Sequence, residues 1–231
     1  MQSRMKYVAS RDGENVLVPG HYFLFNWIRP YILNKAVLDI GCWSGPLEEL
    51  MIKEKCNVTG IDIESAPLKT ATKKFPKFKF YKHSIVDALP KKEEFDVVLY
   101  FMVIEHIPRG SELVSLININ RSMKKNGTLF INTMNNNLLS NVLDPAFFFG
   151  HRHYSKKELL SLLQLSGFTV KDIKYNAGFY TTLSILILYF FKHALGKKEP
   201  RNRLIDALVR RDYRNKGFAE IDIRAVKTAS I

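Results

Sequence analysis

Residues 36–45 read AVLDIGCWSG, and this stretch decides the fold. Its apolar first half predicts a buried strand, its two glycines predict a tight turn, and Pro46 begins a helical pattern. Gly41 and Gly45 let the backbone bend and let a ligand come close, because no Cβ is in the way. A strand, a glycine turn and a helix N-terminus present backbone N–H groups to a ligand. The stretch therefore predicts a ligand-binding loop, which nicotinamide and flavin enzymes also use.

A carboxylate follows this loop at an informative distance. Residues 57–62 read NVTGID, a second short apolar strand that ends in Asp62, roughly 20 residues after the glycines. At this position a carboxylate accepts hydrogen bonds from a ribose diol. The alternative is that Asp62 only closes a turn at the end of the strand.

Strands and helices alternate along the chain. The pattern predicts strands at 36–40, 57–62, 78–82, 95–100 and 128–133, and helices at 46–55, 66–74 and 111–124. This alternation predicts an α/β fold with a doubly wound, mostly parallel sheet and right-handed crossovers. Ligands of such sheets lie at the carboxyl ends of the strands, where Gly41, Asp62, Ile85 and Phe101 fall.

Two further segments frame this core. Residues 21–33 read HYFLFNWIRPYIL and predict a helix that either caps the ligand site or, as we favour, buries Phe23, Phe25 and Trp27. Pro30 predicts a kink or a new turn in it. Later, a capping box at 155–158 begins a helix at 159–166, and strands are predicted at 168–173 and 218–226.

The ordered motifs resemble those of class I S-adenosylmethionine-dependent methyltransferases. They are LDIGC at 38–42, GIDI at 60–63, FDVVL at 95–99, EH at 105–106 and NGTLFI at 126–131. The resemblance covers residues 5–227 and is strongest to the small-molecule group with the ubiquinone-type and sugar O-methyltransferases. It implies a seven-stranded Rossmann-like sheet with an antiparallel edge hairpin and S-adenosylmethionine as the cofactor. Trp43 departs from the pattern, because the family usually has glycine there.

The resemblance also implies which residues bind the cofactor. The loop would contact the amino-acid part of the cofactor through its backbone, supported by Asp39, while Asp62 would hold the ribose. Adenine would lie against Ile63 and near the backbone of Ile85, where the family often has an acid and this chain has Asp87 two residues on. The expected cofactor-binding residues are Asp39, Gly41, Cys42, Trp43, Gly45, Asp62, Ile63, Ile85 and Phe101.

Methyl transfer from a sulfonium depends on holding the acceptor close and in line. A hydroxyl acceptor benefits from a base with a pKa near 7, for which histidine is the usual residue. The predicted catalytic residues are His106, Glu105 and His153, with His151 as an alternative base, although each histidine could be structural.

Ubiquinone-type enzymes use an acid three residues before the Glu-His pair in a metal site. Met102 stands there, so no metal is expected.

Composition sets broader limits. The 231 residues predict one domain: an arm at 1–35, a cofactor-binding core at 36–133, an acceptor-side segment at 134–176, a helical insertion at 177–216, and a last strand and tail at 217–231. Two cysteines give no disulfide framework, and we see no secretory signal, so a cytoplasmic protein is expected. The net charge of +13 indicates an anionic partner or surface.

The insertion carries much of this charge. Its first part, 177–191, is nearly uncharged, and residues 192–216 hold nine Lys or Arg against three acids. An apolar helix followed by a basic one is typical of peripheral contact with an anionic membrane through 180–216. The alternative, which we favour, is a helix buried against the domain or in a homodimer.

The predicted function is O-methylation of a small-molecule, glycan or lipid-linked acceptor. An RNA methyltransferase is the first alternative, prompted by the basic charge. Nucleic acid is nevertheless not expected, because the fourth strand ends in Tyr-Phe-Met at 100–102 and the basic residues lack interleaved aromatics. A second alternative is a silent cofactor-binding protein in which Trp43 fills part of the pocket.

Overall fold

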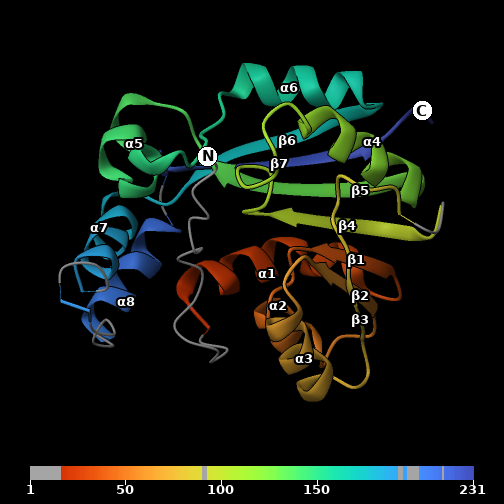
Figure 1. Cartoon of the computed structure of the whole chain (residues 1–231), viewed down its shortest axis with the longest axis horizontal. Coiled ribbons are helices and arrows are strands. Elements are labelled where there is room, and N and C mark those ends of the chain that lie inside the picture. Colours follow the sequence, from red (N-terminus) through yellow and green to blue (C-terminus); the bar gives the residue numbers. More distant parts are fainter. Residues whose placement is uncertain (1–16, 90–92, 192–194, 197–202, 215) are drawn as a thin grey trace.

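One seven-stranded sheet organises the protein. The computed structural model describes residues 17–89, 93–191, 195–196, 203–214 and 216–231. The strands follow the order β3-β2-β1-β4-β5-β7-β6 (Figure 1). Their bounds are β1 Ala36–Ile40, β2 Asn57–Asp62, β3 Lys79–Lys82, β4 Phe95–Phe101, β5 Met123–Met134, β6 Phe168–Asn176 and β7 Glu220–Lys227.

The strand directions confirm the predicted fold class. β1 to β5 pair in parallel, whereas β7 runs antiparallel to both of its neighbours, β5 and β6. The strand order reverses between β1 and β4, and ligands of doubly wound sheets bind outside the carboxyl ends at such a point. The sheet therefore directs attention to the residues that follow β1, β2 and β4.

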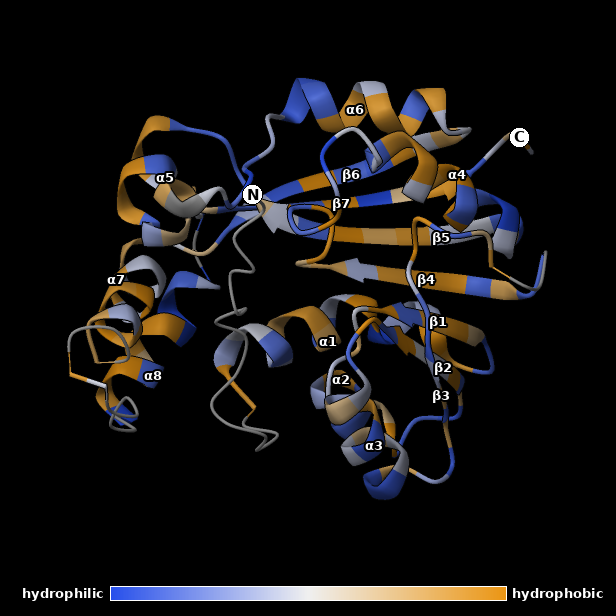
Figure 2. Ribbon diagram, in the orientation of Figure 1, coloured by the Kyte–Doolittle hydropathy of each residue, from blue (hydrophilic) through white to orange (hydrophobic). Residues whose placement is uncertain are grey.

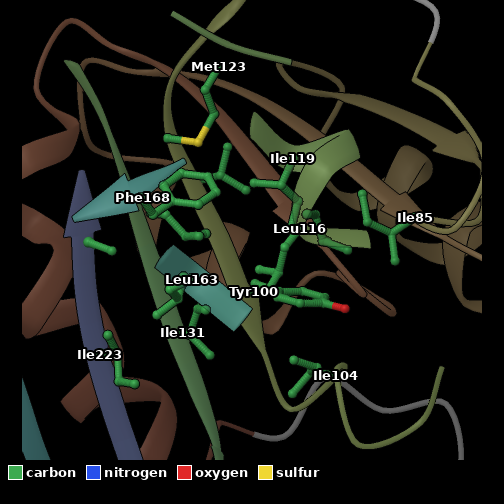
Figure 3. Packing of buried hydrophobic residues seen from close by; sticks show 14 of the residues in the cluster. Ile85, Tyr100, Ile104, Leu116, Ile119, Met123, Ile131, Leu163, Phe168 and Ile223 are labelled. Carbon is green, nitrogen blue, oxygen red and sulfur yellow. The ribbon is translucent and has the colours of Figure 1, made fainter. Parts of the chain in front are cut away.

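Helices cover both faces of the sheet (Figure 1). On one face lie α1 (Pro19–Ile32), α2 (Pro46–Met51) and α3 (Ser65–Lys74), and on the other α4 (Glu112–Ser122) and α6 (Lys156–Leu165). Alternate residues of each strand point to opposite faces. Leu99 packs in the cluster below α1, while Tyr100 packs with Leu116 and Leu163 beneath α4 and α6 (Figure 3).

The aromatic residues of α1 belong mainly to the core, as we favoured. Phe25 is buried, and the Trp27 ring meets that of Phe130 edge-on at 4.9 Å. Phe23 stacks on Tyr213 with ring centroids 5.0 Å apart. Pro30 lies inside the helix, two residues before its end at Ile32. Residues 1–16 of the expected arm lie outside the described ranges.

Four helical segments gather at the end of the sheet toward which β4 and β5 point (Figure 1). They are α5 (Leu138–Leu143), the 3₁₀ helix η1 (Pro145–Phe149), α7 (Phe179–Tyr189) and α8 (Arg203–Asp212). α7 packs between α5 and α8, and the Asp212 carboxylate accepts a hydrogen bond of 2.7 Å from the Thr181 N–H. Helices in the insertion were expected; residues 192–194, 197–202 and 215 of it lie outside the described ranges.

Several expected boundaries differ from the observed ones. The helix predicted at 46–55 ends at Met51, and the one predicted to reach residue 124 ends at Ser122. β5 begins at Met123, which pairs with Phe95 of β4, and the lysines before Gly127 belong to this strand. Within the acceptor-side segment, residues 138–149 form α5 and η1, which were not among the predicted helices and which the Asn137 and Asp144 side chains cap.

Candidate active site

The glycine loop between β1 and α2 is tied to the end of β2. The N–H groups of Gly41 and Cys42 both donate to the Ile61 carbonyl, at 2.7 and 3.2 Å. The φ angles of Gly41, Trp43 and Gly45 are +76°, +50° and +85°. This left-handed conformation is costly for residues with a Cβ, which explains why glycine usually occupies the position of Trp43.

The Asp62 carboxylate fastens this loop to the segment after β2. Its Oδ2 accepts the Trp43 N–H and its Oδ1 accepts the Glu64 N–H, each at 2.9 Å. A carboxylate oxygen has two lone pairs, so each oxygen keeps one for a ligand hydroxyl. Asp62 thus stands where the sequence placed it, and its contact with ribose stays a prediction.

Three acids surround the loop: Asp39, Glu48 and Asp62 are all buried. Burial raises the pKa of Glu48 to about 7 and, together with the charge of Glu48, holds that of Asp39 well above its usual range. Neither carboxylate oxygen of Glu48 meets a donor among the described residues. This concentration of acid favours a ligand that carries positive charge. Glu48 was not among the expected site residues.

Replacing Glu48 with Gln is expected to stabilise the protein at pH 8 but not at pH 4.5. The raised pKa means that the folded protein keeps a proton that the unfolded chain loses above its ordinary pKa of 4.5. Stability therefore falls as pH rises from 4.5 to about 7 and then levels off. We expect a gain of about 3 kcal/mol at pH 8, or roughly 6–12 °C in Tm. Thermal denaturation across this pH range measures it.

Glu49→Gln is the matched control for this prediction. Glu49 is the next residue of α2 but is part-exposed and pairs with Lys74 at 2.6 Å. Its replacement should leave the shape of the stability–pH curve unchanged. If Glu48→Gln raised the stability equally at pH 4.5 and pH 8, the pKa of the Glu48 carboxyl would not be raised in the folded protein, and the prediction would be wrong.

The residues expected around adenine differ in accessibility. Ile63 is 61% exposed directly after Asp62, so its side chain is open to a ligand. Ile85 is buried, and its carbonyl accepts the Asn118 side-chain amide at 2.9 Å. Phe101 is also buried, with its ring stacked near that of Trp27. The structure thus leaves Ile63 as the side chain best placed for direct contact.

Glu105, His106 and His151 form a compact group that we call the His–Glu cluster. Glu105 is buried, its Oε2 accepts the Thr133 hydroxyl at 2.9 Å, and its Oε1 meets no donor among the described residues. The Nε2 atoms of the two histidines lie 3.3 Å apart. Oε1 of Glu105 is 3.9 Å from the first and 4.0 Å from the second. Glu105 and His106 therefore lie together with His151, and their catalytic role stays a prediction.

Asp144 orients the second histidine of this cluster. Its Oδ2 lies 3.0 Å from Nδ1 of His151 and 2.9 Å from Nε2 of His153. The other ring nitrogen of His153 lies 2.8 Å from the Asn141 Oδ1, and the residue is buried. Both ring nitrogens of His153 are thus engaged, Nε2 with Asp144 and Nδ1 with Asn141. His151, which the sequence offered only as an alternative, is the histidine that reaches the cluster.

The pKa values in this region favour neutral imidazole at His106. Burial, with the charges of His151 and Arg152, lowers the His106 pKa to about 3. Burial also raises the pKa of Glu105 to about 7. Burial alone would raise the pKa of Asp144, but hydrogen bonds from His151 and His153 hold it well below its usual range. A histidine with so low a pKa is a weak base, yet its lone pair can bind a cation.

Arg152 fixes the loop that carries Glu105 and His106. Its guanidinium donates to the carbonyls of Ile104 at 2.8 Å and Glu105 at 3.2 Å, and also to that of Ile107. It pairs at the same time with the Glu112 carboxylate of α4. The sequence showed this arginine between two histidines but gave no sign of its role.

The glycine loop and the His–Glu cluster adjoin each other. A Cβ on Gly41 would come within 2.4 Å of a methyl group of Val103, so the loop after β4 packs directly against the glycine turn. The His106 N–H donates in turn to the Val103 carbonyl at 2.8 Å. A ligand on the glycine loop would therefore lie next to a pair of histidines and a buried acid.

The fold and this site define a class I S-adenosylmethionine-dependent methyltransferase. The cofactor carries a sulfonium and an ammonium group, and the three buried acids around the loop fit those positive charges. The chain belongs to this family: a family model described as "Methyltransferase domain" matches residues 21–173.

Curated relatives agree with this assignment. The ubiquinone biosynthesis O-methyltransferase of Pseudomonas fluorescens is 32% identical over 167 residues, which cover 64% of this chain and 71% of that protein. The enzyme of the same name from Pasteurella multocida is 31% identical over 121 residues. That match covers 46% of this chain and 49% of the relative, so the chain spans about half the length of some relatives that it matches.

Solved structures share the fold. A SAM-dependent methyltransferase from Archaeoglobus fulgidus has a TM-score of 0.63 at 20% identity, covering 90% of this chain and 94% of that one. Geranyl diphosphate methyltransferase in complex with SAM has a TM-score of 0.65 at 12% identity, covering 90% and 84%. At these identities the likeness concerns the fold alone.

Proposed function

We propose that this methyltransferase methylates a hydroxyl of a small acceptor that carries an apolar chain. The observation that carries the proposal is the His–Glu cluster beside the glycine loop, because a hydroxyl must lose its proton when it is methylated. The names of the curated relatives, ubiquinone biosynthesis O-methyltransferases, support oxygen as the accepting atom.

The proposed division of work follows the segments of one domain. The core at 36–133 holds the cofactor, with Asp62 on the ribose and the loop on the amino-acid part, and the segment at 134–176 supplies the acceptor side. S-adenosylmethionine supplies an activated methyl group, so the new O–CH₃ bond forms as the S–CH₃ bond breaks and a neutral thioether leaves. The hydroxyl proton departs at the His–Glu cluster, where Asp144 orients His151 as the base. Holding the two reactants in line supplies most of the rate.

An apolar surface next to the cluster supports an acceptor with an apolar chain. The Phe147 ring of η1 lies 4.9 Å from that of His153, and Phe148 beside it is 70% exposed. α5 continues this surface with Leu138, which is 82% exposed, and with Leu139 and Val142. Figure 2 shows hydrophobic residues along α5 and α7 at this end of the molecule.

A methyl-transfer assay on the purified protein tests the proposal. Labelled S-adenosylmethionine would be offered with a phenol that bears an isoprenoid tail, the same phenol without the tail, a glycan and transfer RNA. We expect methylation of the phenols, faster with the tail. Methylation of transfer RNA alone would favour the RNA-methyltransferase alternative, and methylation of the glycan alone would replace the apolar acceptor. Cofactor binding without transfer to any acceptor would favour a silent binding protein.

We further propose that the apolar surface rests on an anionic membrane at its cytoplasmic face. The exposed apolar residues of α5 and η1 continue onto Phe179, Leu183 and Leu186 of α7, and α8 beside it exposes Arg203 and Arg210. Apolar side chains flanked by arginines are the pattern of an interfacial helix. Within the described ranges, no helix has the length and apolar content needed to cross a bilayer.

Flotation with liposomes is expected to carry the protein upward when the vesicles contain phosphatidylglycerol but not when they contain only phosphatidylcholine. The Leu138→Ser/Phe148→Ser double variant should lose most of this binding, because it removes the two most exposed apolar side chains of the surface. Tyr22→Ser, an exposed aromatic of α1, is the control and should float like the parent. Sedimentation as a dimer that the double variant abolishes, with no flotation, would instead assign the surface to a homodimer.

A further inference from the structure

We propose that the His–Glu cluster is a binding site for a divalent transition-metal ion of the zinc class. The ligand atoms would be Oε1 of Glu105, Nε2 of His106 and Nε2 of His151. The sequence argued against a metal because Met102 replaces the acid that ubiquinone-type enzymes use. In the structure the third ligand is His151, which lies 46 residues after Glu105 in the sequence.

The spacing of the three atoms suits such an ion. Their separations are 3.3, 3.9 and 4.0 Å. The point equidistant from all three lies about 2.2 Å from each atom, close to the zinc–nitrogen and zinc–oxygen bond lengths of about 2.0–2.2 Å. No ligand atom would have to move by more than a few tenths of an ångström.

The surroundings of the ligands are those of a built site. Oε1 of Glu105 is a buried acceptor without a donor among the described residues, which is costly unless a cation or proton meets it. Asp144 accepts the Nδ1–H of His151 and so leaves the Nε2 lone pair directed at the cluster. This carboxylate–histidine arrangement is the usual support behind a metal-binding imidazole.

The second group of candidate ligands, Asp144 with His151 and His153, is less suitable. Oδ2 of Asp144 lies within hydrogen-bonding distance of both rings, and Oδ1 accepts the Ala146 N–H at 2.9 Å. These groups satisfy one another without an ion. They form the support, and the His–Glu cluster forms the site.

The ligand types select the metal. Two imidazoles and one carboxylate suit zinc, iron or cobalt, whereas magnesium prefers oxygen ligands. The side chains of His106 and His151 are part-exposed, so the outer side of the site is open to an acceptor oxygen. Resting on the proposed function, a bound ion would lower the pKa of the acceptor hydroxyl. His151 would then act as a ligand of the ion rather than as the base.

Cobalt binding tests the inference without any acceptor. The purified full chain, stripped with a chelator, would be titrated with Co²⁺, and visible absorption and metal content would be measured. We expect one ion per chain and a ligand-field band, displaced by Zn²⁺ but not by millimolar Mg²⁺. His151→Ala should weaken binding on the order of 100-fold or more, and Asp144→Asn about 10- to 100-fold.

His83→Ala is the matched control, because His83 lies outside the cluster, and it should bind cobalt like the parent. Circular dichroism and cofactor affinity would show that each variant is folded. Failure of the parent to bind cobalt, or equal losses in His151→Ala and His83→Ala, would overturn the site. Cobalt bound as expected with no O-methylation would leave the site standing and refute the proposed function instead.

Discussion

Asp62→Ala is expected to weaken S-adenosylmethionine binding by about 100-fold or more. The Asp62 carboxylate holds the Trp43 and Glu64 N–H groups and, as we propose, both hydroxyls of the cofactor ribose. A hydrogen bond to a charged group contributes about 1.5–3 kcal/mol, so the loss of two ribose contacts alone reaches about 3 kcal/mol. Isothermal calorimetry with S-adenosylmethionine and with the demethylated product measures this loss, which should be similar for both ligands because they share the ribose.

Two comparisons make the result specific. Asp62→Asn should be nearly as damaging. Both carboxylate oxygens accept a backbone N–H, and the asparagine NH₂ group would face one of these N–H groups with a donor in place of an acceptor. Asp87→Ala should bind like the parent, because Asp87 is an exposed acid and the Ile85 backbone, rather than this carboxylate, is expected near adenine. If both Asp62 variants bound S-adenosylmethionine as tightly as the parent, the ribose of the cofactor would not lie at Asp62.

Arg152→Ala is expected to lower both stability and activity. The guanidinium satisfies three backbone carbonyls and pairs with Glu112, and both side chains are mostly buried. Removing one partner of such a pair costs about 3–5 kcal/mol, which corresponds to a fall of roughly 6–20 °C in Tm. The released loop would also misplace Glu105 and His106, and a shift of about 1 Å costs on the order of 100-fold in rate.

Arg109→Ala is the control for Arg152, because Arg109 lies in the same loop but is exposed. Thermal denaturation and methyl transfer should both be close to those of the parent. Arg152→Lys keeps the charge but not the planar fork of donors, so it should recover only part of the loss. Full recovery by lysine would mean that charge, rather than the loop carbonyls, explains the role of Arg152.

The sequence predicted the fold well because local patterns and sheet topology agree. The bounds of β1 and β2 match the predicted ranges, and the capping box at Ser155 forms as expected. The helix predicted at 111–124 ends at Ser122 instead, because the backbone becomes extended at Met123 and begins β5. The short helices α5 and η1 were not predicted; the side chains of Asn137 and Asp144 cap their N-termini.

The site was only partly predictable. Gly41, Asp62, Glu105 and His106 lie on motifs with fixed positions at strand ends, so their placement followed from topology. The contacts of Asp144 and Arg152 depend instead on how the segment after β5 folds back over the loop after β4, which no spacing encodes. The pair of histidines at 151 and 153 was the available signal, and it could not tell which of them faces the cluster.

The position of β7 between β5 and β6 affects how the protein can be made. β6 is synthesised first, yet its hydrogen-bonding partner arrives only after the helical insertion has followed it from the ribosome. Until then β5 and β6 both present unpaired edges to other nascent chains. Synthesis that stalls within the insertion should therefore yield an aggregation-prone fragment. Newly made chains should depend on chaperones until β7 pairs with both β5 and β6.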